Sequence, residues 1–321
     1  MKRLPVEQRP EAYCVCHTNF QFKSQFGKYQ GKVRDVYDIG DRLIVITTDR
    51  ISAFDHVLPR PIPYKGQVLN QIAGMFLDQT RSIVPNWLIE MPDPNVAVGW
   101  KCQPIKIEMV VRAYLAGHAW RLYSGGQRVI CGVRLPDGMV QNQAFEKPII
   151  TPTTKADAGH DQDVSLEELR KARGMNVSLL DDMCEVALRL FEYGSQWASG
   201  QGLLLVDTKY EFGLRGNELM LMDEIHTPDS SRYFEKDPYE QLLAEGLPQR
   251  QLSKEFVREW LMSKGFQGLS GQQMPVMPDA MVWMVAERYL ELYERITGKS
   301  FAPPPAEPAE ARLSRNLAGY F

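Results

Sequence analysis

The chain has 321 residues, of which 44% are hydrophobic and 24% are charged. This length is too great for one small core and suits one large domain or two closely packed domains of ordinary globular composition. The formal net charge of −3 at pH 7 argues against a generally basic surface for nucleic acid, but it allows a local basic pocket for a small anion.

Five cysteines are irregularly spaced along the chain, and no two of them form a CxxC pair. They are Cys14, Cys16, Cys102, Cys131 and Cys184. This pattern is typical of free thiols in a reducing compartment and completes no zinc site. The first residues lack an apolar stretch, and no apolar run is long enough to cross a bilayer. We therefore expect a cytoplasmic protein with no membrane partner and no nucleic-acid partner.

The first part of the chain is predicted to be rich in β-structure. Residues 1–25 show no clear period and are expected to form an irregular arm. Residues 31–40 alternate as in a strand, Gly40 and Asp41 are typical of a tight turn, and residues 42–48 are β-branched. These two strands are expected to form a hairpin.

The spacing of apolar residues then changes. Over residues 68–79 they recur three and four positions apart, which predicts a helix. Residues 104–114 are β-rich and predict a strand that ends before Gly117. Residues 119–123 are expected to open a short helix.

The later part of the chain is richer in helices. Ser165 with Glu168 matches a capping box, and Ser178 with Asp181 predicts a second helix start. Further predicted elements are strands over residues 203–212 and 218–225, a helix over residues 278–297 and an extended proline-rich tail over residues 303–308. The whole is predicted to be a mixed α+β fold without internal repeats.

A charged strip is predicted on the hairpin that follows residue 203. Alternation places Asp207, Lys209 and Glu211 on one face of the first strand. A three-residue loop, residues 215–217, would put the apolar residues on the other face and set Asp223 opposite Lys209, within roughly 5–8 Å of Glu211. A slip of one residue would turn Asp223 to the apolar face, so burial favours the three-residue loop.

Two interpretations of this strip stay open on pattern alone. Carboxylates so close repel one another, and Mg²⁺ bridging them to phosphate oxygens would relieve the repulsion. The pattern is also typical of a solvated strand face with ordinary ion pairs.

Cations near the start of the chain are a second candidate site. Lys32 and Arg34 follow Gly31 at the beginning of a strand, as in a hairpin that covers nucleotide phosphates. The spacing of a Walker loop is absent, and an exposed basic strand has the same pattern.

Other polar groups have two interpretations each. Asp49, Arg50, Ser52 and Asp55 follow a buried-type strand, where they either line a site or stabilise a turn.

Arg112 ends an apolar strand and needs an anion, either a phosphate or a carboxylate in a salt bridge. Residues 151–161 are a polar loop. The zinc, nucleophile-elbow and dinucleotide motifs HExxH, GxSxG and GxGxxG are absent from the sequence.

Six segments together resemble one family closely, the phosphoribosylaminoimidazole-succinocarboxamide synthases, or SAICAR synthetases. They are residues 31–37, 48–55, 104–117, 151–161, 205–213 and 223–232, in the order that the family has them. The resemblance implies an ATP-grasp-like fold with a β-rich N-terminal lobe, residues 1–115, and a mixed α/β C-terminal lobe, residues 116–321. The nucleotide is expected between the lobes.

The resemblance also implies a reaction. ATP, carboxyaminoimidazole ribonucleotide (CAIR) and L-aspartate would give SAICAR, ADP and phosphate through an acyl phosphate, with Mg²⁺ as the cofactor, in purine biosynthesis. The alternative is another ATP-grasp-like kinase or ligase that acts on a phosphorylated small molecule. The sequence does not give the oligomeric state.

Roles for individual residues follow from the same resemblance. Lys32, Arg34, Glu108 and Lys209 would lie at the nucleotide, and Glu211 and Asp223 would hold Mg²⁺. Arg112, Ser230 and Arg232 would bind the CAIR phosphate, while Lys155, Lys209 and Asp49 would lie near the reacting groups. His118 stands where the family usually has serine, so an imidazole replaces a hydroxyl donor at this expected phosphate contact.

Overall fold

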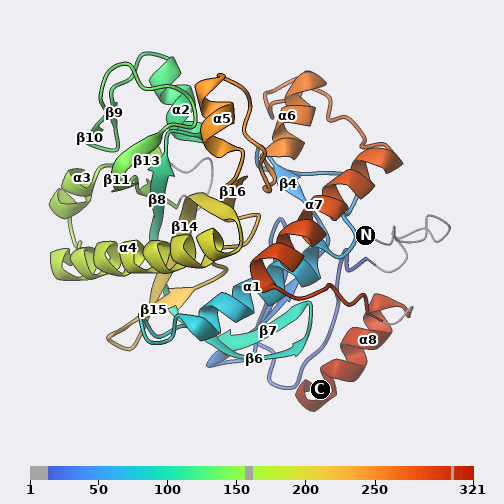
Figure 1. Cartoon of the computed structure of the whole chain (residues 1–321). Helices are drawn as coiled ribbons and strands as arrows, with labels where there is room; N and C mark the ends of the chain where they lie inside the picture. The colour runs from blue at the N-terminus through green and yellow to red at the C-terminus, as the bar shows by residue number, and fades with distance from the viewer. Residues whose placement is uncertain (1–13, 156–161, 305–306) are drawn as a thin grey trace. The chain divides into compact units, whose positions relative to one another are not determined.

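The computed structural model describes residues 14–155, 162–304 and 307–321 (Figure 1). The chain divides into two compact units. Unit 1 comprises residues 1–74, 88–101 and 254–321, and unit 2 comprises residues 75–87 and 102–253. This division differs from the predicted lobes, because the chain leaves unit 1 before residue 115 and its last 68 residues belong to unit 1 again.

Unit 1 is built on an antiparallel sheet of five strands. Their order across the sheet is β1 (Gly27–Gln30), β2 (Arg34–Asp38), β3 (Arg42–Thr47), β7 (Val96–Trp100) and β6 (Leu88–Asp93). The predicted hairpin is confirmed, since Asp38 on β2 pairs with Leu43 on β3. Gly40 takes a φ of 102° in the connecting turn, a conformation that favours glycine.

Helices and two short strands complete unit 1. They are β4 (Ser52–Ala53), β5 (His56–Val57), α1 (Lys65–Gln79, which continues into unit 2), α6 (Glu255–Ser263), α7 (Asp279–Thr297), α8 (Ala309–Asn316) and the 3₁₀ helix η2 (Ala318–Tyr320). The helices predicted over residues 68–79 and 278–297 are confirmed as α1 and α7. Helix α8 was not predicted, because the proline-rich segment before it is typical of an extended chain.

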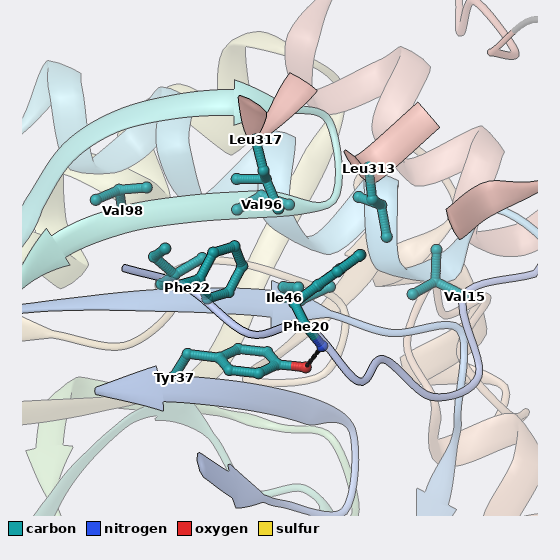
Figure 2. Close-up of a cluster of buried hydrophobic side chains, with 10 residues drawn as sticks. Val15, Phe20, Phe22, Tyr37, Ile46, Val96, Val98, Leu313 and Leu317 are labelled. Carbon is teal, nitrogen blue, oxygen red and sulfur yellow. Dashed lines mark hydrogen bonds between the residues drawn. The ribbon is translucent and has the colours of Figure 1, made fainter. Parts of the chain in front are cut away.

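The core of unit 1 joins segments from both ends of the described chain (Figure 2). Phe20 and Phe22, from the irregular arm, pack near the Tyr37 ring, and Tyr37 Oη accepts a hydrogen bond from Phe20 N at 3.1 Å. Leu313 and Leu317 from the α8 segment are at most 1% exposed in the same cluster. Residues 14–25, the described part of the arm, therefore lack regular structure, as expected, but contribute side chains to the core.

Unit 2 contains a sheet of seven strands. The path is β13 (Gln162–Asp163), β12 (Thr153–Thr154), β8 (Gln103–Tyr114), β14 (Leu203–Arg215) and β15 (Glu218–Met222), with β11 (Ala144–Ile150) also paired to β8 and β16 (Ser231–Glu235) to β14. The predicted strands at residues 104–114 and 203–212 are confirmed as β8 and β14. These two strands run antiparallel at the centre of the sheet and carry most of the charged residues considered below.

The other elements of unit 2 lie around this sheet. They are β9 (Val129–Ile130), β10 (Val133–Arg134), α2 (Gly117–Ser124), α3 (Leu166–Lys171), α4 (Val177–Gly200) and α5 (Tyr239–Ala244). The predicted capping box at α3 is confirmed, with Ser165 N 2.8 Å from Glu168 Oε2 and Glu168 N 3.1 Å from Ser165 Oγ. The predicted start at Ser178 is wrong: Asn176 caps α4 and accepts from Leu179 N, so Ser178 lies inside the helix.

The predicted hairpin register between β14 and β15 is also wrong. Arg215 pairs with Glu218 around a two-residue loop, and Glu211 pairs with Met222. Gly216, with a φ of 62°, suits the first position of such a tight turn. Burial did not select the register because Met220 and Leu221, on opposite faces of β15, are both at most 3% exposed.

Within the part of the chain that the structure describes, no helix combines the length and the apolar character needed to span a membrane.

Candidate functional site

A row of alternating charges lies on one face of β8 and β14. Glu108 on β8 pairs across the sheet with Glu211 on β14. Lys209 Nζ lies 2.7 Å from Glu108 Oε1 and 2.9 Å from Glu211 Oε1. Lys155, which follows β12, forms a second ion pair with Glu211. The predicted common face of Lys209 and Glu211 is therefore correct, and β8 and the segment after β12 add to it.

The charges in this row stabilise one another. Burial acts to raise the pKa of Glu211, but the ammonium groups of Lys209 and Lys155 outweigh it and hold that pKa well below its usual range. Burial likewise acts against the charge on Lys209, yet Glu211, Glu108 and Asp223 raise its pKa. Glu211 and Lys209 are therefore both ionised at neutral pH.

Asp223 reaches this row by a break in the strand and not by the predicted alternation. Strand β15 ends at Met222, and Asp223 takes a φ of 59°, in the left-handed region. Trp87 Nε1 donates a hydrogen bond to the Asp223 carbonyl at 2.9 Å and helps to hold this turn. Asp223 raises the pKa of Lys209, so these two residues lie near each other as predicted. The cause is the left-handed turn at Asp223 and not the alternation of side chains along a strand.

The donor chemistry of the row fits Mg²⁺. Glu108, Glu211 and Asp223 supply three carboxylates against the two lysines, Lys155 and Lys209, which leaves one negative charge and hard oxygen donors. Among the described residues, no group of three His, Cys, Asp or Glu side chains is close enough to hold a metal by itself. Mg²⁺ usually keeps water and substrate phosphate oxygens as ligands, so it needs only one or two carboxylate ligands from the protein.

An arginine cluster lies further along the same two strands and on the neighbouring strand β16. Arg112 on β8 pairs with Asp207 on β14. Arg112 Nη1 lies 3.0 Å and Arg232 Nη1 lies 2.9 Å from the same oxygen, Asp207 Oδ2. Burial lowers the pKa of Arg112, Asp207 opposes this effect, and Arg232 adds to it. Two guanidinium cations against one carboxylate leave a net positive charge that suits an anion.

Gly117, at the start of α2, makes close packing with Arg232 possible. A Cβ atom at this position would lie 2.4 Å from both terminal nitrogens of Arg232, and the φ of Gly117 is 55°. Only glycine is free of strain in this conformation. Gly117, which was predicted only to end the preceding strand, therefore also makes room for the Arg232 guanidinium.

His118 and Ser230 have partners of their own. His118 Nε2 lies 2.7 Å from Asp163 Oδ2 on β13, so this imidazole is paired with a carboxylate. Ser230 is 8% exposed, and its Oγ accepts from Thr227 N at 3.2 Å. Both residues belong to unit 2 together with the arginine cluster, but each side chain already has a protein partner.

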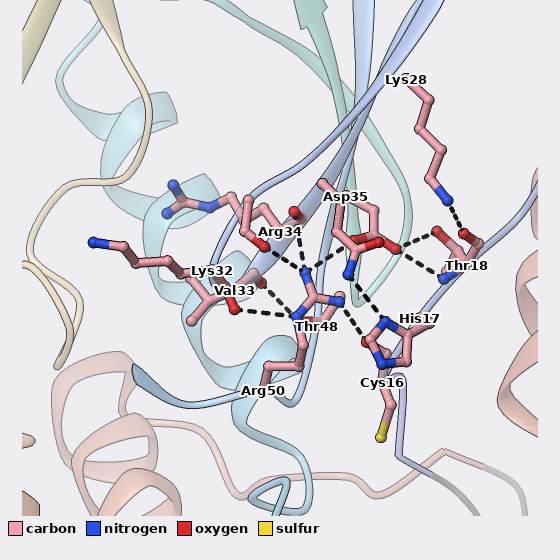
Figure 3. A network of polar contacts seen from close by, with 12 residues as sticks. Cys16, His17, Thr18, Lys28, Lys32, Val33, Arg34, Asp35, Thr48 and Arg50 are labelled. Atoms are coloured by element: carbon pink, nitrogen blue, oxygen red, sulfur yellow. Dashed lines mark hydrogen bonds and ion pairs between the residues drawn. The ribbon is translucent and has the colours of Figure 1, made fainter. Parts of the chain in front are cut away.

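The predicted nucleotide contacts Lys32 and Arg34 belong to unit 1, where Arg50 organises the backbone around them (Figure 3). Arg50 donates to the carbonyl oxygens of Lys32 and Gly31 at 3.1 Å and 2.9 Å, and to Asp35 Oδ1 at 2.9 Å. The side chains of Lys32 and Arg34 extend in the same direction, away from this network. Lys32 is about half exposed and pairs with Asp55.

Asp49 is held in the interior of unit 1. It is 2% exposed, and its carboxylate accepts from Val15 N at 2.7 Å and from Gly66 N at 2.8 Å. Burial raises the pKa of Asp49 to about 6. These contacts tie the N-terminal arm to the start of α1, which is a structural use of the carboxylate.

Some participants were not among the predicted site residues. Asp207 was recognised as part of the charged strip and Arg232 as a phosphate contact, but their pairing with each other was not foreseen. Thr151, Asp163 and the organising role of Arg50 were also missed. The local sequence holds no signal for these contacts, because they join residues far apart in the chain. Residues 156–161 of the predicted polar loop lie outside the described residues.

Comparisons with known proteins show the family of this chain. The family model described as SAICAR synthetase matches residues 27–273. The phosphoribosylaminoimidazole-succinocarboxamide synthase of Cytophaga hutchinsonii is 55% identical over 305 residues, which cover 94% of this chain and 98% of that protein.

Solved structures show the same fold. The SAICAR-synthase from Saccharomyces cerevisiae, complexed with SAICAR, has a TM-score of 0.75 and 28% identity, and covers 90% of this chain and 100% of that one. A SAICAR synthetase in complex with ADP has a TM-score of 0.66 and 24% identity over 86% of this chain and 100% of that one. The predicted SAICAR synthase-like, ATP-grasp-like fold and the predicted family are both confirmed.

Proposed function

This chain belongs to the SAICAR synthetase family of purine-biosynthesis ligases, and we propose that its active site uses ATP to join L-aspartate to CAIR, giving SAICAR, ADP and phosphate. The yeast relative is described in complex with SAICAR, and another member of the fold in complex with ADP. Both descriptions support small-molecule substrates of these kinds. The cytoplasmic location expected from the sequence stays a prediction.

The chemistry requires charge stabilisation more than covalent help from the protein. A carboxylate is a poor electrophile, because oxide would have to leave. Transfer of the terminal phosphoryl group of ATP to the CAIR carboxylate gives an acyl phosphate, and attack of the aspartate amine then expels phosphate. Cations that meet the negative charge in both steps lower the barriers.

Mg²⁺ fits the carboxylate row, with Glu211 and Asp223 as the proposed ligands and Glu108 beside them. When bound, it would neutralise charge on the transferring phosphoryl group. Lys209 is held between Glu108 and Glu211 and is proposed to contact phosphate oxygens. Lys155, on the other side of Glu211, is proposed to approach the reacting carboxylate.

The arginine cluster is proposed to bind the phosphate of CAIR, with Arg112 and Arg232 as the main contacts and His118 and Ser230 beside them. Lys32 and Arg34 are proposed to contact the phosphates of ATP. Asp49 stays outside the proposed catalytic set, because its carboxylate is buried and accepts two backbone hydrogen bonds.

The observation that carries the proposal is that strands β8 and β14 carry both the Glu108–Lys209–Glu211 row and the Arg112–Asp207 pair, to which Arg232 is added from the neighbouring strand β16. One arrangement suits metal-assisted phosphoryl transfer, and the other suits a phosphorylated substrate. A ligase that activates a carboxylate on a ribonucleotide needs both within the length of one small molecule.

The test is a reaction of the purified chain with ATP, Mg²⁺, CAIR and aspartate, followed by ADP release and the absorbance of the product. We expect ADP release to require CAIR and aspartate together. Release at the full rate with CAIR alone would indicate a kinase, and ATP binding without turnover would indicate a non-catalytic protein. Arg112→Ala is expected to raise KM for CAIR while the ATP parameters stay unchanged.

A further inference from the structure

One carboxylate oxygen, Asp207 Oδ2, accepts hydrogen bonds from two arginines. Arg112 Nη1 and Arg232 Nη1 lie 3.0 Å and 2.9 Å from it. The three side chains are at most 12% exposed. Two buried guanidinium groups repel each other, and this single oxygen is the point at which both are held.

Further contacts fix the direction of each arginine. Thr151 Oγ1 accepts from Arg112 Nε at 2.8 Å. The Arg232 guanidinium lies so close to Gly117 that a Cβ atom there would be 2.4 Å from its terminal nitrogens. Arg112 Nη2 makes no hydrogen bond to the described residues, so its N–H groups are available to a ligand. The cluster therefore resembles a site prepared for a planar, two-armed contact with an anion.

We propose that Asp207 is a positioning residue, which holds Arg112 and Arg232 together as a two-armed site for the phosphate monoester of the substrate. The identification of this substrate as CAIR rests on the proposed function above. The geometric part of the proposal applies to any sugar phosphate that carries the same group.

Positioning and simple charge balance predict opposite results when the Asp207 charge is removed. A carboxylate beside an anion site repels the anion. If this repulsion were the main effect of Asp207, removal of the Asp207 charge would strengthen phosphate binding. If Asp207 instead holds the two arginines in place, its removal lets them separate, and phosphate binding weakens. The sign of the change therefore decides between the two.

The experiment measures the binding of ribose 5-phosphate to the full chain by titration calorimetry. For Asp207→Asn we expect binding about tenfold to one hundredfold weaker than wild type, the range typical for loss of charge-assisted hydrogen bonds. ATP affinity, measured in the same way, is expected to stay at the wild-type value. Equal or tighter binding of ribose 5-phosphate by folded Asp207→Asn would overturn the proposal.

A thermodynamic cycle with Arg232→Gln tests whether Asp207 acts through the arginine. If it does, Asp207→Asn weakens ribose 5-phosphate binding much less in the Arg232→Gln background than in the wild type. Equal effects in both backgrounds would contradict action through Arg232.

Matched variants separate positioning from loss of folding. Asp35 is a comparable buried carboxylate, with Oδ1 2.9 Å from Arg50 Nη2 in unit 1, so Asp35→Asn should lower the melting temperature without changing the affinity for ribose 5-phosphate. If Asp207→Asn does not fold, Asp207→Glu keeps the charge and displaces the carboxylate by one methylene. Wild-type affinity in Asp207→Glu would then refute positioning, and weaker binding would support it.

The proposed function and the role of Asp207 can be refuted separately. A wild-type chain that binds ribose 5-phosphate in an Arg112-dependent manner, but releases no ADP with CAIR and aspartate, would refute the ligase assignment and leave the role of Asp207 intact.

Discussion

Lys209 Nζ lies 2.9 Å from Glu211 Oε1, two residues further along the same strand. The pair is held on the face of β14 that also carries Asp207, and Lys155 reaches Glu211 from a separate segment. Glu211 therefore balances two ammonium groups, and in the proposed mechanism the same carboxylate holds Mg²⁺.

Replacement of Glu211 by glutamine is expected to lower kcat by several tens-fold or more. The amide is a weaker metal ligand and no longer neutralises Lys209 and Lys155, so stabilisation of the transferring phosphoryl group is lost. Initial rates at saturating ATP, CAIR and aspartate measure this effect. Glu218→Gln, at an exposed position on β15, is the control and should retain wild-type kcat. Near-normal turnover of Glu211→Gln at saturating Mg²⁺ would exclude the metal role.

Gly117→Ala is expected to raise KM for CAIR by about tenfold or more, because the new methyl group displaces the Arg232 guanidinium. Gly216→Ala is a matched control: Gly216 has a φ of 62°, close to the 55° of Gly117, but open space where the Cβ would be. Both variants suffer backbone strain of about 1–2 kcal/mol. Steady-state kinetics and thermal melting of both separate strain from displacement, and an equal KM in the two variants would argue against the contact.

Local sequence patterns predicted elements well where a single segment supplies all the information. The β2–β3 hairpin, β8, β14, the Ser165 capping box and α7 are of this kind. The register of β15 was wrong because both faces of that strand are buried, so alternation held no information. The Gly216–Asn217 pair, a usual two-residue turn, was the better guide.

The alternation of side chains along a strand predicted part of the site from local sequence. Lys209 and Glu211 follow directly from it, but Asp223 depends on a left-handed residue that no alternation rule contains. Asp49 was expected near the substrates from the family resemblance, while the polar pattern after its strand left a site and turn chemistry open. Its two hydrogen bonds to Val15 N and Gly66 N depend on long-range packing that local sequence does not encode.

His226 is expected to make the protein sensitive to acid. This histidine is fully buried, its Nε2 lies 2.7 Å from Tyr210 Oη, and burial lowers its pKa from 6.5 to about 3. Below pH 6.5 the unfolded chain binds a proton that the folded chain does not. The free energy of unfolding therefore falls as the pH falls towards 3, by up to about 3–5 kcal/mol from this group.

Urea unfolding of the wild type and of His226→Gln between pH 7 and pH 4 measures this contribution. The stability advantage of the wild type over the variant should shrink as the pH decreases. His17→Gln, at an exposed position, is the control and should change stability little. A constant difference between wild type and His226→Gln across this pH range would contradict the assignment.

Leu317→Ala is expected to destabilise unit 1 by about 2–5 kcal/mol, because it leaves a cavity among buried side chains. Leu269→Ala is the control, since Leu269 is 63% exposed in the same unit and should change stability little. Chemical denaturation of both variants gives the comparison. An equal loss in the two would mean that the α8 segment does not contribute to the core.

The packing of Leu313 and Leu317 against Phe20 and Phe22 also sets an order of events during synthesis on the ribosome. All of unit 2, residues 75–87 and 102–253, emerges before residues 313–317 do. Unit 2 can therefore fold while the aromatic side chains of the N-terminal arm still lack their last apolar partners. Nascent chains stalled before residue 313 should expose this surface to chaperones, even when the strands that carry Glu211 and Arg112 have already paired.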